Sequence, residues 1–104
     1  MRPGRREKRH QILITGRELE ELKRFTGSMV EAFGLDRRVW NYRGTRPIGF
    51  YRWDLDCLED VTWLALVDDD RYPDKSGPGY EAMKRLHERI KRLRDEAYGE
   101  DSKV

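Results

Sequence analysis

Residues 76–99 read SGPGYEAMKRLHERIKRLRDEAYG and predict a long helix. Ser76, Gly77 and Pro78 are typical of a helix start, because proline lacks only an amide that the first turn leaves unpaired. Gly99 is expected to end the helix, as glycine often does. The apolar residues recur at alternating steps of three and four, the narrow seam of antiparallel helix packing: Met83, Leu86, Ile90, Leu93 and Ala97.

A second helix is predicted over about residues 16–33, where leucine, methionine and phenylalanine recur with helical spacing. Thr15 and Glu18 have the spacing of a capping box, in which each side chain accepts a hydrogen bond from a backbone amide of the first turn. Gly34 suits the left-handed residue that follows a helix.

A third helix is predicted over residues 55–68, with Asp54 as its cap. Its expected inner face consists of Leu55, Leu58, Val61, Leu64 and Ala65. The apolar run from Val61 to Val67 is equally compatible with a buried strand, so periodicity alone leaves both structures open.

These patterns predict a mainly α fold. It is a small three-helix domain with an Arg/aromatic loop or short β-hairpin between the helices at 16–33 and 55–68, which are the first two along the chain. The alternative is an α+β fold with strands at 11–15 and 61–67. A chain of 104 residues has room for one domain, which we expect to span residues 11–98. Residues 1–10 are expected to form a flexible basic tail and residues 99–104 a flexible C-terminal tail.

Residues 35–53 read LDRRVWNYRGTRPIGFYRW, in which five arginines alternate with five aromatic residues. Gly44 and Thr45 favour a turn, so that 38–43 and 46–52 are expected to pair as a hairpin. Aromatic faces stack on bases and guanidinium groups bind phosphates, which suits a ligand with flat rings and negative charge. The predicted ligand-binding residues are Arg37, Arg38, Trp40, Tyr42, Arg43, Arg46, Tyr51 and Arg52.

This pattern predicts a non-catalytic binding module for nucleic acid or a phosphate-bearing nucleotide. Two other interpretations stay open. In the first, the arginines of 35–53 neutralise the acidic run 54–70, which holds seven acids and no base. Tryptophan, tyrosine and arginine are also the residues enriched at protein interfaces, so an adaptor or inhibitor that uses Trp40, Trp53 and the 76–99 seam is the alternative function.

Composition narrows the class of protein further. Charged residues make up 40% of the chain, but a net charge of only +2 and eleven aromatics favour a folded domain over disorder. The single cysteine, Cys57, excludes an internal disulfide and suggests a buried thiol in the cytoplasm. We expect no membrane span, since the longest apolar run is far too short. A homodimer is possible if the 76–99 seam is exposed.

Motifs of catalysis are missing from the sequence: no Walker loop, dinucleotide fingerprint, HExxH or nucleophile elbow occurs in it. We therefore expect neither enzymatic activity nor a cofactor. The aspartates at 54, 56 and 68–70 are the best candidates for a metal site, but a calcium loop starting at Asp70 has Tyr72 and Lys75 at defining positions. We expect no metal, and we expect His87 to be a packing or surface residue.

Overall fold

The computed structural model describes residues 9–29 and 34–102, the last three of them by backbone only. Within this part of the chain the elements are β1 (His10–Ile12), α1 (Gly16–Lys23), a 3-10 helix η1 (Thr26–Met29), α2 (Leu35–Asn41), β2 (Ile48–Phe50), α3 (Arg52–Val67) and α4 (Pro78–Ser102). The predicted mainly α fold is confirmed.

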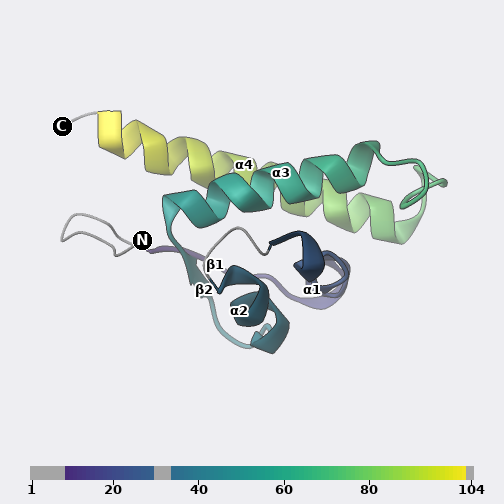
Figure 1. Ribbon diagram of the computed structural model, residues 1–104, viewed down its shortest axis with the longest axis horizontal. Helices are drawn as coiled ribbons and strands as arrows, with labels where there is room; N and C mark the ends of the chain where they lie inside the picture. The colour runs from purple at the N-terminus through teal and green to yellow at the C-terminus, as the bar shows by residue number, and fades with distance from the viewer. Residues whose placement is uncertain (1–8, 30–33, 103–104) are drawn as a thin grey trace.

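The two long helices form one layer and the remaining elements form the other (Figure 1). α3 and α4 run antiparallel, side by side, and α1, α2 and the two strands lie along one side of them (Figure 1). The seam predicted in 76–99 faces the core: Met83, Leu86 and Ile90 are fully buried, Ala97 is nearly so, and Leu93 is partly buried. This burial removes the seam as a surface for an adaptor or a homodimer.

α1 is shorter than the sequence predicts, because it ends at Lys23 and not near residue 33. The amide of Phe25 donates to Leu22 O and the Thr26 hydroxyl donates to Lys23 O, which converts the chain to a 3-10 turn. Thr26, Gly27 and Ser28 are poor helix formers, so this local chemistry outweighs the apolar period. Residues 30–33 of the predicted helix lie outside the described residues.

The predicted caps of α1 are also corrected. Thr15 is its N-cap residue, but its side chain makes no capping hydrogen bond, and Glu18 pairs with Arg89 of α4 at 2.6 Å instead. Gly34 has the predicted left-handed conformation (φ 75°), but it precedes α2 and does not close α1. A buried carboxylate, Glu21, accepts hydrogen bonds from Arg17 and Arg24, and from the Tyr72 hydroxyl at 2.7 Å. Glu21 therefore links α1 to Tyr72, which lies in the connection between α3 and α4.

The predicted hairpin between 38–43 and 46–52 does not form, since residues 35–41 are helical. β2 lies within the second predicted strand, but it pairs antiparallel with β1, in the register His10↔Phe50, Gln11↔Gly49 and Ile12↔Ile48. Leu35 and Val39, four residues apart, are both buried and give α2 its inner face. The strand pair thus closes a loop that contains α1, η1 and α2.

α3 confirms the helical interpretation of 55–68, and the strand alternative for 61–67 is wrong. Its N-cap is Tyr51; Asp54 lies three residues further on, where its Oδ2 accepts a hydrogen bond from the Tyr51 amide at 3.0 Å. Leu64 was expected inside but is 62% exposed, while Leu66 is buried. α4 continues through Gly99 to Ser102, so the predicted helix end is wrong. Among the described residues, no helix is both long and apolar enough to cross a membrane.

Candidate functional site

α2 presents one polar face to solvent because its other face belongs to the core. Leu35 and Val39 are buried, whereas Arg37 and Trp40, three residues apart on the helix, are exposed. Side chains at this spacing are neighbours on a helix surface. Trp40 is 62% exposed, which it shares with Leu64 as the highest value among the exposed large apolar side chains of the described residues. A large indole in solvent beside a guanidinium group is the arrangement that the sequence predicted for base stacking.

The loop after α2 is held against the N-terminal segment by Tyr42 and Gly44. The Tyr42 hydroxyl donates to Arg46 O and accepts a hydrogen bond from the Ile14 amide at 3.3 Å. Gly44 has φ 73°, and a Cβ there would lie 3.0 Å from both Ile14 O and a methyl group of Leu19. Only glycine combines this conformation with this close approach. The loop is therefore fixed, with Arg43 and Arg46 on its exposed side.

Lys23 joins this surface from α1, and nothing in the sequence pattern pointed to it. Its ammonium donates to Trp40 O at 2.8 Å and lies 6.0 Å from the centre of the Trp40 ring. The contact bridges seventeen residues of sequence, so only the tertiary fold reveals it. We refer to Lys23, Arg37, Trp40, Arg43 and Arg46 together as the Arg–Trp surface.

The three arginines of the Arg–Trp surface are available to a ligand. Arg37, Arg43 and Arg46 are exposed, and none of them forms an ion pair with any described residue. Most other arginines of the described chain are paired: Arg17 and Arg24 with Glu21, Arg89 with Glu18, and Arg94 with Asp56 and Glu59. Three arginines without an ion pair to a described residue thus lie on α2 and the loop that follows it.

Arg38 has an internal role. Its Nη2 lies 2.8 Å from Oδ1 of the buried Asp54, and its Nη1 donates to Gly49 O at 3.4 Å. Through Arg38 the loop neutralises one acid of the run 54–70, as the second interpretation of the sequence expected. Asp56 and Glu59 receive their charge partner from α4, through Arg94.

The last two predicted ligand residues lie at the start of α3. Tyr51 stacks on Trp53, with ring centres 4.8 Å apart, and both are half-buried. Arg52 lies over the ring of Tyr98 of α4, at 6.0 Å. The structure therefore leaves Arg37, Trp40, Arg43 and Arg46 exposed on α2 and the loop that follows it, and gives Arg38, Tyr42, Tyr51 and Arg52 contacts within the chain.

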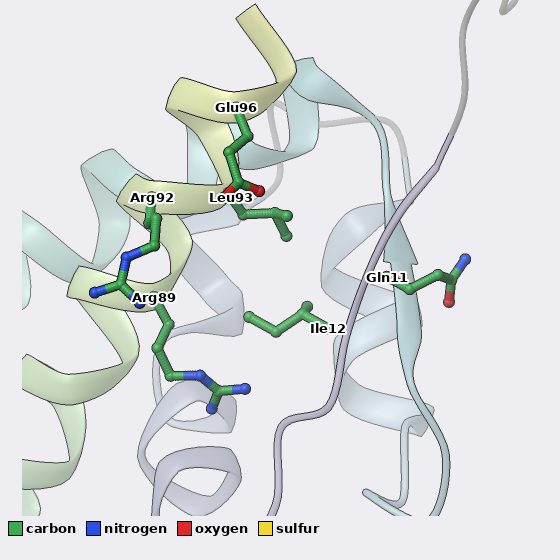
Figure 2. A pocket seen from close by; sticks show the side chains of 6 residues that line it. All are labelled: Gln11, Ile12, Arg89, Arg92, Leu93 and Glu96. Atoms are coloured by element: carbon green, nitrogen blue, oxygen red, sulfur yellow. The ribbon is translucent and has the colours of Figure 1, made fainter. Parts of the chain in front are cut away.

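A pocket of about 150 Å³ lies between β1 and α4 (Figure 2). Figure 2 shows Ile12 and Leu93 on its apolar side, with Arg89, Arg92 and Glu96 projecting from α4. Arg89 is held by Glu18 and donates to Leu13 O at 2.6 Å. Pockets for drug-sized ligands measure about 300–1,000 Å³, so this one is too small to enclose a nucleotide.

The candidate metal ligands do not assemble. Among the described residues, no group of three or more histidine, cysteine, aspartate or glutamate side chains is placed to hold a metal ion. His87 lies between the two long helices, where its Nδ1 is 2.8 Å from the Thr62 hydroxyl and its ring is 5.7 Å from that of Trp63. Cys57 is half-buried and packs against the core.

No protein-family model, curated protein or solved structure matches this chain. The Arg–Trp surface is therefore interpreted from its own geometry.

Proposed function

We propose that this protein binds single-stranded nucleic acid, without catalysis, through the Arg–Trp surface. Arg37, Arg43 and Arg46 would contact phosphates, and Trp40 would stack on a base. The observation that carries the proposal is the 62% exposure of Trp40 on the same helix and loop as three exposed arginines that lack ion pairs within the described chain. A basic surface with an exposed aromatic ring is the usual platform for single strands.

The exposure of the Arg–Trp surface favours a strand over a free nucleotide as the ligand. A mononucleotide gains affinity by being enclosed, whereas Trp40 is 62% exposed and Arg37, Arg43 and Arg46 are exposed as well. A strand needs only successive phosphate contacts and a ring on which to stack. The loop after α2 supports this function, since the backbone that carries Arg43 and Arg46 is held by Tyr42 before the ligand arrives.

We expect the protein to act in the cytoplasm. The sequence contains one cysteine and therefore no internal disulfide, as is typical of a reducing compartment.

The proposal is tested by titrating a fluorescein-labelled oligothymidylate of about twelve nucleotides and measuring its anisotropy. Trp40→Ala should weaken binding by about 5- to 150-fold, the loss expected for a stacking energy of about 1–3 kcal/mol. Trp63→Ala is the matched control, because Trp63 is also exposed (53%) but lies on α3. It should leave the affinity unchanged.

Salt dependence tests the arginines separately. Replacing Arg43 and Arg46 by glutamine should reduce the slope of log K against log salt by about 1.4, because each phosphate contact on a single strand contributes about 0.7. Lys84→Gln/Lys91→Gln removes the same charge from exposed positions of α4 and should leave the slope unchanged. An equal reduction of the slope in both double variants would show only a general attraction of the protein to a polyanion. Tighter binding of a mononucleotide than of the oligonucleotide would contradict the preference for a strand.

A further inference from the structure

α3 carries a second exposed surface that the Arg–Trp surface does not include. Trp63, Leu64 and Val67 are 53%, 62% and 51% exposed. They follow one another at helical spacing on the side of α3 opposite its buried leucines, and Asp60 lies one turn before Leu64. We call Asp60, Trp63, Leu64 and Val67 the α3 outer face. Adjacent large apolar side chains in solvent are typical of a protein interaction site.

Trp63 is held in position by the neighbouring helix. Its ring lies 5.7 Å from that of His87, whose Nδ1 is 2.8 Å from the hydroxyl of Thr62. Thr62 is itself buried and donates to a carbonyl one turn earlier, Leu58 O, at 2.8 Å. The indole is thus part of a fixed α3–α4 edge, which lowers the entropy lost when a partner covers it.

Negative charge lies at both ends of the α3 outer face. Asp60 precedes the apolar residues and Asp68, Asp69 and Asp70 follow them, all exposed. Lys75 lies 3.2 Å from Asp69 and Arg71 lies 3.9 Å from Asp68, whereas Asp60 and Asp70 form no ion pair with described residues. A second copy of this chain would bring the same acids to the interface, and an anionic lipid surface would be repelled.

We propose that the α3 outer face binds an amphipathic helix of a partner protein, with leucine-type residues along its contact stripe and lysine or arginine at its flanks. The apolar stripe would cover Trp63, Leu64 and Val67, and the basic flanks would pair with Asp60 and Asp70. In this mode of recognition the apolar anchors of an amphipathic helix would supply affinity and its flanking charges would select the partner. The surface is distinct from the Arg–Trp surface, so neither proposal depends on the other.

The probe is a fluorescein-labelled helical peptide of about 18 residues, made of leucine and lysine in an amphipathic pattern. Its matched counterpart replaces every lysine by glutamate. Anisotropy titration of the full chain should show binding of the lysine peptide and at least about tenfold weaker binding of the glutamate peptide. The double variant Asp60→Asn/Asp70→Asn should bind the lysine peptide more weakly, and the affinity should depend less on salt.

The apolar contribution is tested with Leu64→Ser/Val67→Ser, two exposed positions whose replacement leaves the core intact. The double variant should lose at least about tenfold in affinity for the lysine peptide. Leu13→Ser is the matched control, since Leu13 is 46% exposed but precedes α1. Unchanged affinity in the double variant would overturn the proposal. The proposal would also be overturned if sedimentation showed that the parent protein is a dimer and that the double variant is a monomer. The α3 outer face would then bind a second copy of this chain.

Discussion

The ion pair between Arg38 and Asp54 connects α2 to the first turn of α3. Asp54 is fully buried, while the Arg38 side chain is 36% exposed, so the carboxylate depends on a partner that is still reached by water. Oδ2 of Asp54 is satisfied by the Tyr51 amide, but Oδ1 has the ion pair and no aligned hydrogen bond. Arg38 is therefore the main compensation for a buried negative charge.

Removal of that compensation should destabilise the fold. Arg38→Met keeps much of the side-chain volume but leaves Asp54 without its cation, which for fully buried pairs costs about 3–5 kcal/mol. We expect about 2 kcal/mol here, because Arg38 is partly in solvent. The measurement is urea unfolding at neutral pH. Asp54→Asn in the Arg38→Met background should restore part of the loss, and additive effects of the two changes would contradict the coupling.

Tyr42 shows where residue-level prediction from sequence stops. Its place among arginines and aromatics predicted a stacking ring, and the structure uses its hydroxyl to join Ile14 to Arg46. Ring and hydroxyl are both present in any tyrosine, so composition cannot tell which one the fold employs. Trp40, whose indole N–H is its only polar side-chain group, remains exposed.

At the scale of elements, His87 is a titratable group at the α3–α4 contact whose ordinary pKa lies near neutrality. It faces Thr62, Trp63 and Glu59 of α3, with Glu88 and Lys91 beside it on α4. Burial lowers the pKa of His87 below its ordinary value, against the opposing effect of Glu59. The folded protein therefore favours neutral His87 more than the unfolded chain does.

This difference makes stability depend on pH. Because the unfolded chain binds the proton more readily, the contribution of His87 is fully present above its ordinary pKa of about 6.5 and is lost as the pH falls below that value. The free energy of unfolding should decrease between about pH 7.5 and about pH 5.5, a range in which most carboxylates stay ionised. His87→Gln should flatten this dependence. If the free energy of unfolding of the variant depended on pH as steeply as that of the parent, groups other than His87 would be responsible for the pH dependence.

Helices with a long apolar period were predictable, and short elements were not. The seam of α4 and the inner face of α3 follow from periodicity, apart from Leu64. α2 has only seven residues, too few for a period to stand out, and its arginines and aromatics resemble a strand. The early end of α1 was present in the sequence as Thr26, Gly27 and Ser28, but the apolar residues beyond them masked it.

At the scale of the whole molecule, the two proposed surfaces are well separated. Asp54, which contacts α2, precedes Leu64 by ten residues on α3, about 15 Å along the helix axis. This exceeds the Debye length of about 10 Å at 0.1 M salt. The 43 Å length of the molecule, set largely by α4, leaves room for both ligands.

Independent binding follows from this separation. Saturating the chain with the leucine–lysine peptide should change its affinity for the oligonucleotide by no more than about twofold, since coupling requires a shared contact or a shared conformational change. Anisotropy of the labelled oligonucleotide, with unlabelled peptide in excess, measures this directly. A mixture of peptide and oligonucleotide without protein is the control for their direct association. A larger change would show that the surfaces overlap or communicate.

The pairing of β1 with β2 also has a consequence for the order in which the chain folds. Bringing His10 to Phe50 closes a loop of about forty residues, an entropic cost that the α3–α4 contact largely avoids, because those helices are joined by a short connection. We therefore expect the helical hairpin to be structured in the transition state and the strand pair to form after it. The segment that carries Arg37, Arg43 and Arg46 would then be the last to become ordered, and the first to open when the protein begins to unfold.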